Sequence, residues 1–500
     1  MRVLGILLIV AGTCVAAPAQ TNTAPVQKLS LDDCIQRALE KNLDMRIARY
    51  DPPEKLADLQ AAYAGYNPSF TFGGQHGFSE SGGGFNSSLG IPTFGTTGDL
   101  NSFNSSLGGS APWGLNYTLQ GKLAESFGSA GPGAPFDNAS GSAGITLSQP
   151  LLKNFWIDKN RFSIKVAKNR VRYSELGLKQ KIMNTVTTVE QAYYDLIYDR
   201  ENVTVQEKAV ELAMQLVVEN KKRVEVGSLA PLDEMQAESQ AASSQFALIA
   251  AQATLVTQQN TVKQLITDDY AAIEPIELQP TAPLSAPIQV FDRQISWSKG
   301  LTERPDLLQA KLDIEQQGIT LKYDYNQLFP ELDIQGAYGY TGGGAGISEY
   351  SQVLNQIAGQ QQPNWSFGGQ LTYPIGNTAA RATYRKDKLA MEVLVLTLKK
   401  LEQTIIITID NDIVQAKSSY QQVAATRAAR EYAAAALDAE QKKLENGKST
   451  TYTVLQMQRD LTTARGNEIQ ALDNYNKALS QLSADEGTTL QRLGINVEVR

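Results

Sequence analysis

The sequence of 500 residues is poor in the side chains that carry most enzyme and metal chemistry. It has one histidine, His76, and two cysteines, Cys14 and Cys34. With so few of these residues, neither a zinc site nor a cysteine–histidine nucleophile pair can be assembled. The glycine clusters at 82–84 and 342–344 lack the strand–glycine–helix context of a phosphate-binding loop. We therefore predict a protein that is not an enzyme and that needs no metal and no cofactor.

Long apolar runs are also missing. Beyond Val10, no apolar stretch approaches the roughly 18 residues that a transmembrane helix needs. The longest candidate, residues 389–409, is interrupted by Lys399, Lys400 and Glu402. Any membrane contact is therefore expected to come through strands. The formal net charge of -7 gives no basic surface for nucleic acid, so we expect no nucleic-acid partner.

The N-terminus has the pattern of a secretory signal peptide. An arginine precedes an apolar segment over residues 3–10, and Ala17-Pro18-Ala19 precedes Gln20 as a cleavage site. We predict that residues 1–19 are removed and that Cys14 is lost with them. Cys34 is then the only thiol, so no internal disulfide can form.

The two halves of the chain repeat one plan. Asn42-Leu43-Asp44 and Arg304-Pro305-Asp306 each precede a helical stretch, which ends at Asn67-Pro68 in the first copy and at Phe329-Pro330 in the second. A segment rich in glycine and aromatic residues follows, and then two long helical stretches separated by a break. We predict a first repeat over 20–273 (strand region 68–150, helical hairpin 158–270), a linker over 274–300, a second repeat over 301–485 (strand region 330–374, helical hairpin 376–485) and a tail over 486–500.

The helical stretches carry a seven-residue apolar period. Such a period, held over many turns, predicts a left-handed supercoil with neighbouring helices. Asp199, Gln206 and Asn220 lie between the apolar positions, so we expect a helix that keeps one wet face. At 1.5 Å per residue, 158–226 would reach roughly 100 Å, too long for a compact globule. The apolar positions are Ile182, Val189, Leu196, Val203, Val210, Val217 and Val224.

The glycine-rich segments alternate apolar and polar residues. Strands with one aromatic face and one polar face are typical of a transmembrane barrel. A soluble sandwich would show the same period, with its apolar face turned to a core. The long helices favour the barrel, because a sandwich has no need of them. The candidate lipid-facing residues are Phe70, Phe72, Leu332, Ile334, Trp365, Phe367, Leu371 and Tyr373.

One part of the first strand region has no counterpart in the second copy. Residues 79–143 are far longer than the corresponding loop, and Leu115, Tyr117, Leu119 and Leu123 alternate with polar residues there. A single extra strand would leave the chain on the wrong side of the membrane. The segment is therefore either a long extracellular loop or an added pair of strands.

These features together resemble the TolC-like outer-membrane efflux proteins, and the resemblance covers nearly all of the chain after the signal peptide. It depends on the order, duplication and spacing of several motifs, none of which is specific alone. They are the N-terminal stretch 29–35 with Ala38-Leu39 and Asn42, the Asn67-Pro68 and Phe329-Pro330 junctions, Gln149-Pro150-Leu151-Leu152, and the helix breaks around Gly227 and Gly447.

The resemblance implies a mixed α + β membrane protein that works as a homotrimer. Each protomer would give about four strands to one shared transmembrane β-barrel of twelve strands. A long α-helical coiled-coil barrel would continue it across the periplasm, with the linker and the tail in a small mixed domain around it.

The implied function is the outer-membrane exit duct of a tripartite efflux or type I secretion system. The duct would conduct substrates passively, in contact with outer-membrane lipid, a periplasmic adaptor (membrane fusion) protein and an inner-membrane pump of the RND, ABC or MFS type. The alternative is a coiled-coil structural or adhesive surface protein. A fibre would favour helices without a reversal, whereas both helical stretches reverse here, at Gly227 and Gly447.

The resemblance also implies roles for the two helix breaks. Each is expected to be a hairpin tip that contacts the adaptor, with glycine supplying the backbone freedom for the turn. The expected contact residues are Gly227, Ser228, Leu229, Gly447, Lys448 and Ser449.

The closed periplasmic aperture would be lined by residues next to the tips. The family's acidic position after the first glycine is matched by Asp233, whereas two further positions fall on the uncharged Thr453 and Gln456. Asp233 also fits a second role, as a negative charge favoured by the N-terminal dipole of the following helix.

Overall fold

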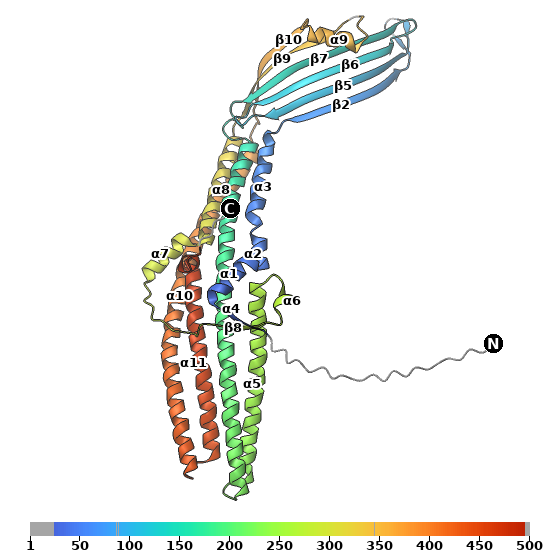
Figure 1. The fold of residues 1–500 in the computed structure, drawn as a ribbon. Coiled ribbons are helices and arrows are strands. Elements are labelled where there is room, and N and C mark those ends of the chain that lie inside the picture. The colour runs from blue at the N-terminus through green and yellow to red at the C-terminus, as the bar shows by residue number, and fades with distance from the viewer. Residues whose placement is uncertain (1–24, 87, 89, 345, 496–500) are drawn as a thin grey trace, which may run out of the picture. The chain divides into compact units, whose positions relative to one another are not determined.

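The computed structural model describes residues 25–495 except 87, 89 and 345 (Figure 1). The predicted signal peptide and Cys14 lie outside the described residues. The chain forms two compact units. We name them the hairpin unit (Met1–Met45, Thr185–Gln289 and Gln415–Ser480) and the sheet unit (Arg46–Asn184, Val290–Val414 and Gln481–Arg500). Each unit draws on both halves of the sequence, so the boundaries of the two repeats stay a prediction.

The sheet unit contains a fully antiparallel sheet of six strands in the order β10-β9-β7-β6-β5-β2. A separate two-stranded ribbon, β3 (Gly84–Asn86) with β4 (Ile91–Thr93), lies in sequence between β2 and β5. The six strands are β2 (Ser69–Ser81), β5 (Thr96–Ser110), β6 (Asn116–Ser129), β7 (Pro135–Pro150), β9 (Glu331–Gly343) and β10 (Pro363–Thr372).

The number of strands corrects one prediction. The mixed α + β class is confirmed, but the sheet has six strands rather than about four. The segment 79–143 supplies the difference, because it forms the added pair β5 and β6 between β2 and β7 rather than only a loop. The alternation seen from Tyr117 to Leu123 is that of β6, and Leu115 ends the turn before this strand.

The strand register gathers the apolar residues on one face of the sheet. Directly opposed residues of antiparallel strands point to the same side. Apolar pairs of this kind occur across the whole sheet, and the residues between them are mostly Ser, Thr, Asn, Gln and Gly. Examples of the apolar pairs are Phe70 with Leu107, Leu107 with Leu119, Leu119 with Ile145, Ile145 with Tyr338, and Tyr338 with Trp365.

Helices make up the rest of the sheet unit. The isoleucine-rich run 404–409 is helical, and Ile405 and Ile409 are buried in a cluster with Leu307. The elements are α3 (Asp51–Tyr63), η1 (Ala64–Tyr66), the first part of α4 (Lys159–Glu225), α7 (Arg293–Glu303), α8 (Pro305–Gln327), α9 (Tyr350–Ala358), the first part of α10 (Thr378–Glu445) and α12 (Thr489–Arg492).

The hairpin unit is mainly helical. A parallel pair of short strands, β1 (Val26–Leu29) and β8 (Glu277–Pro280), accompanies its helices. A capping box between Ser30 and Asp33 begins α1. The helices are α1 (Leu31–Lys41), the first part of α2 (Leu43–Ala48), α5 (Pro231–Ile266), α6 (Tyr270–Ile273), most of α11 (Thr451–Asp485), and the remaining parts of α4 and α10.

The seven-residue period has the expected structural effect in α4. Val189, Leu196 and Val203 are buried, and Val210 packs against a cluster of Val203, Leu248 and Ala251. A second cluster joins Leu216 to residues of α10 and α11. Among the described helices, none is both long enough and apolar enough to cross a membrane.

A matched pair of glycines tests the packing in the sheet unit. A Cβ atom at Gly300 in α7 would lie 2.5 Å from Cδ1 of Ile409, whereas one at Gly318 in α8 would meet nothing within 4 Å. Gly300→Ala should therefore destabilise the protein by about 1–3 kcal/mol through overpacking. Gly318→Ala should be neutral or stabilise it by up to about 1 kcal/mol, since alanine favours helix. Thermal unfolding of the two variants beside the unchanged protein measures both effects, and equal midpoints would contradict the close contact.

Candidate functional site

The first hairpin tip joins α4 to α5 through a glycine-centred turn. Gly227 has a φ of +76°. Its N–H donates to the Val224 carbonyl at 2.9 Å, and the N–H of Ser228 donates to the Arg223 carbonyl at 2.8 Å. This pair of bonds is a Schellman motif, which closes a helix end with a left-handed residue.

The second tip, between α10 and α11, repeats the same motif. Gly447 has a φ of +68°. Its N–H donates to the Leu444 carbonyl at 3.1 Å, and the N–H of Lys448 donates to the Lys443 carbonyl at 2.8 Å. A Cβ atom at either tip glycine would meet nothing within 4 Å. The requirement for glycine therefore comes from the backbone conformation and not from lack of space.

The other predicted tip residues complete the two turns. Gly227, Ser228, Gly447 and Lys448 are exposed, and Leu229 and Ser449 are half-buried. The Ser228 hydroxyl donates to the Arg223 carbonyl at 2.9 Å. The Ser449 hydroxyl donates to the carboxylate of Glu440.

Two of the three predicted aperture residues, Asp233 and Thr453, lie in the first turns of α5 and α11, and Gln456 lies in the second turn of α11. Asp233 is half-buried, and its N–H donates to the Ala230 carbonyl at 3.0 Å. The N–H of Thr453 donates to Oγ1 of Thr450 at 3.3 Å, so Thr453 takes part in capping α11. Gln456 is exposed. The structure is thus compatible with both roles considered for Asp233, and the aperture assignment stays a prediction.

Exposed apolar side chains surround the tips, and the sequence analysis assigned none of the following four to the contact surface. Leu232 and Tyr452 occupy equivalent positions, the second residues of α5 and α11, and both are 62% exposed. Val226 and Met235 are exposed beside the first tip. Apolar side chains exposed together in this way mark a surface that contacts another molecule.

The predicted lipid-facing residues share one face of the sheet. The register pairs Trp365 with Tyr338 and Leu371 with Leu332, and it places Phe70 on the same face through β5, β6 and β7. Leu332 is half-buried and the others are exposed; Trp365 and Phe367 are about three-quarters exposed, at 74% and 75%. Phe72, Ile334 and Tyr373 are exposed as well. Their contact with lipid stays a prediction.

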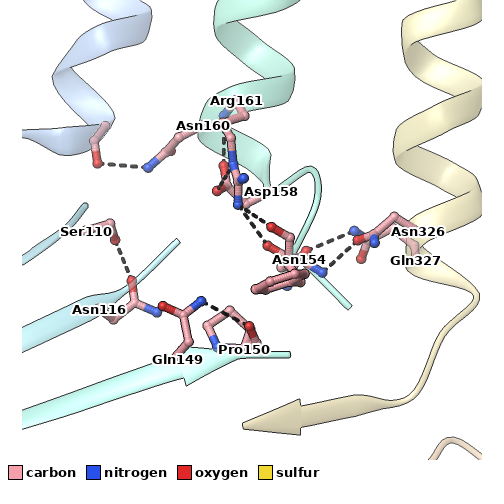
Figure 2. Close-up of polar contacts among 12 residues, drawn as sticks. Ser110, Asn116, Gln149, Pro150, Asn154, Asp158, Asn160, Arg161, Asn326 and Gln327 are labelled. Carbon is pink, nitrogen blue, oxygen red and sulfur yellow. Dashed lines mark hydrogen bonds and ion pairs between the residues drawn. The ribbon is translucent and has the colours of Figure 1, made fainter. Parts of the chain in front are cut away.

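A network of amides connects the sheet to its helices (Figure 2). Asn154, which has a φ of +65°, lies in the loop between β7 and α4. Its N–H donates to Oδ1 of Asn326 at 2.6 Å, and its own Oδ1 accepts from Gln327 at 3.0 Å. Arg161 donates to the carbonyls of Asn154 and Phe155 at 3.2 and 2.8 Å. These bonds therefore hold the end of α8 to the start of α4, next to the end of β7 and the beginning of β9.

The expected wet face of α4 is only partly wet. Asp199 and Asn220 are buried, and Nδ2 of Asn220 donates to the Asp233 carbonyl at 3.2 Å. Burial, followed by the nearby carboxylates of Asp195 and Asp473, raises the pKa of Asp199 to about 6. The expectation was wrong for these positions because α5 and α11 cover them.

Among the described residues, no three His, Cys, Asp or Glu side chains are grouped so that they could hold a metal ion.

The six-stranded sheet, the paired long helices and the two tips define a channel of the outer-membrane efflux class. The family model described as outer membrane efflux protein matches residues 34–267 and 297–487, and the chain belongs to that family. The membership confirms the predicted efflux function and the predicted location in the outer membrane. It gives no support to the alternative of an adhesive fibre.

Individual members of the family resemble the chain over most of its length. The outer membrane efflux protein BepC of Brucella suis biovar 1 (strain 1330) is 24% identical over 365 residues, which cover 72% of this chain and 75% of BepC. The outer-membrane channel OprN superposes with a TM-score of 0.68 at 13% identity, over 92% of this chain and 90% of OprN. The CmeC channel of Campylobacter jejuni gives a TM-score of 0.66 at 16% identity, over 92% of this chain and 86% of CmeC.

The raised pKa of Asp199 predicts a pH-dependent stability. Because its pKa in the folded protein, about 6, lies above the ordinary value of 3.8, the folded state holds the proton more tightly. The free energy of unfolding should therefore fall as the pH rises from about 4 to 6. Asp199→Asn removes this cost and should stabilise the protein at pH 7.5 by on the order of 1–3 kcal/mol, with little effect at pH 4.

Thermal midpoints at the two pH values measure the effect. Asp438→Asn is the matched control. Asp438 pairs with Lys442 and is not among the carboxylates that raise the pKa of Asp199, so its loss should not stabilise the protein at either pH. Equal effects of Asp199→Asn at both pH values would contradict the raised pKa.

Proposed function

We propose that three copies of this chain form one passive exit duct, which carries substrates from a periplasmic adaptor and an inner-membrane pump to the outside. The observation that supports it most strongly is the open sheet. Strands β2 and β10 are its two edges, and within the described chain neither has a partner on its outer side. An unpaired backbone group costs several kcal/mol in hydrocarbon, so an open edge is not tolerated in a membrane.

The direction of the two edge strands suits closure by identical copies. All five pairings in the sheet are antiparallel, so β2 and β10 run in opposite directions. The β2 strand of one copy can therefore pair in antiparallel fashion with β10 of the next. Such head-to-tail contacts close into a ring when the rotation allows it. The number three is the one that the family resemblance implies.

The exposed apolar face supports the same proposal. Its aromatic and aliphatic residues would face lipid, and the opposite face, rich in hydroxyl and amide groups, would line the pore. The tips provide the surface for the adaptor, with Val226, Leu232 and Tyr452 exposed around the two glycine turns. The energy for transport comes from the pump, which would be of the RND, ABC or MFS type.

Two neighbouring residues of β10 test which face meets lipid. Phe367 lies in the middle of the strand on the apolar face, and Ser366 is on the opposite face. Phe367→Arg should weaken the trimer by about 2–4 kcal/mol, because a charge near the bilayer midplane is costly. Ser366→Arg, a matched control in the pore, should leave trimer stability unchanged. Thermal dissociation of purified trimers gives both values, and the reverse order of effects would show that the apolar face is turned inward.

The two tip glycines test the contact with the adaptor. Valine at Gly227 and Gly447 strains a backbone of positive φ by on the order of 1–3 kcal/mol at each tip. The double variant should still form trimers but lose export in cells. Asparagine, which tolerates the left-handed conformation, is the control and should retain export.

The measurement is substrate export beside photo-crosslinking to the adaptor from Ser228 and Lys448. Normal export and crosslinking by the double valine variant would mean that the shape of the tips is unimportant.

A further inference from the structure

The strands β5 and β6 differ from the other four in how they join the chain. Each of β2, β7, β9 and β10 is directly next to a helical segment in sequence, namely η1, α4, α8 and α10. In contrast, β5 and β6 are connected to each other by the short turn 111–115. The pair therefore adds to the sheet without adding a helix. These four helix-linked strands match the four per protomer that the resemblance implies.

We propose that the hairpin β5–β6 widens the outer-membrane pore. Three six-stranded sheets would close a barrel of eighteen strands, whereas a family member with four strands per protomer has a barrel of twelve. The inference rests on the proposed trimeric duct and deepens it. Barrel diameter grows roughly linearly with strand number, so the pore would be about one and a half times as wide. The cargo that such an exit suits is bulky and hydrophilic.

The inserted pair has the two faces of a barrel wall. Phe103, Leu107, Leu119 and Leu123 lie on the apolar face that is shared with the flanking strands. The opposite face of the pair carries Ser102, Asn104, Ser106, Thr118, Gln120 and Lys122. On that face Oγ1 of Thr71 in β2 lies 2.6 Å from Oγ of Ser106, so the polar lining continues from β2 into the insertion. A loop outside the membrane would not need one apolar face and one polar face.

The turn of the insertion fits the junction with the helices. The N–H of Ala111 donates to the Leu115 carbonyl at 2.7 Å, and Gly114 has a φ of +94°. A Cβ atom at Gly114 would lie 2.9 Å from Nη2 of Arg161, in the first turn of α4. Arg161 is held in turn by Asp158, at 2.7 Å (Figure 2). The turn is therefore packed against the start of α4 and belongs to the wall at this end of the sheet.

The insertion also preserves closure. Adding two strands leaves β2 and β10 as the edges and keeps them antiparallel to each other. Single-chain outer-membrane barrels have even numbers of antiparallel strands for the same reason. The three copies can therefore close the wider ring by the same edge contact as the narrower one.

Engineered disulfides test whether the insertion lies within the wall. Thr71 and Ser106 are directly opposed, so Thr71→Cys with Ser106→Cys should form a bond within one chain. Ser69 and Thr146 lie at the same level of the sheet but are separated by β5 and β6. Three strand spacings are about 14 Å, so Ser69→Cys with Thr146→Cys should form none. If the insertion lay outside the wall, β2 would pair with β7 and the two results would be exchanged.

Polymer exclusion measures the width of the pore in the intact protein. Neutral polyethylene glycols of increasing size are added on the outer side of planar bilayers that contain purified full-length trimers, and the change in conductance is measured. A twelve-stranded family member is measured in the same way. The largest polymer that enters should correspond to a diameter about 1.5-fold greater. The disulfide variants are first shown to form trimers under reducing conditions.

The outcomes separate the two proposals. Failure of the unmodified protein to form trimers overturns the proposed duct and the wider pore with it. Trimers that crosslink Ser69→Cys to Thr146→Cys, or that have the polymer limit of a twelve-stranded barrel, overturn the wider pore and leave the duct. Trimers with the Thr71–Ser106 pair and the larger limit support both.

Discussion

The hydrogen bonding of the backbone is the constraint on which the sheet of this channel depends. In the outer membrane no water reaches the hydrocarbon, so each strand must give its N–H and C=O groups to a neighbour. In the proposed trimeric barrel, this requirement accounts for the long, continuous pairing of all six strands. It would also account for the form of the insertion, since only a pair of strands can be added without moving the following helix to the other side of the membrane. The backbone hydrogen bonds form the sheet, and the side chains determine which of its faces is apolar and which is polar.

The helices depend on a different and more local device. The same Schellman motif ends α4 at Gly227 and α10 at Gly447, with the two hydrogen bonds at nearly equal lengths in both. The turn needs nothing from its surroundings, because no neighbouring atom limits a side chain at either glycine. The tips are therefore free to present other residues outward. The exposed apolar residues beside them follow from that freedom.

The sequence allowed prediction of the features that depend on local pattern. The seven-residue period predicted the positions of α4 that are buried as far as Val203, whereas Val210, Val217 and Val224 are only half-buried. The glycine breaks predicted the ends of the long helices. The tip residues could be assigned because the break occurs twice. The shared apolar face of the sheet also followed from simple alternation, although its contact with lipid did not.

Features that depend on distant partners could not be predicted in the same way. Strand β5 carries serine or glycine at many positions, so its alternation is weak and its place beside β2 emerges only from the pairing. Asp199 and Asn220 were expected on a wet face, because the sequence does not show that α5 and α11 cover them. Helix α9 was missed as well, since its nine residues are too few for a clear period.

The pairing of β7 with β9 has a consequence for how the chain folds. It joins Pro150 to Asp333, and the whole first pair of long helices lies in the loop that this contact closes. Helical hairpins form from neighbours in sequence, whereas closing so long a loop has an entropic cost that is recovered only when the strands meet. The helices should thus form first and the sheet last. During that interval the apolar strands are exposed, and the unfinished sheet is the stage at which the chain is most prone to aggregate.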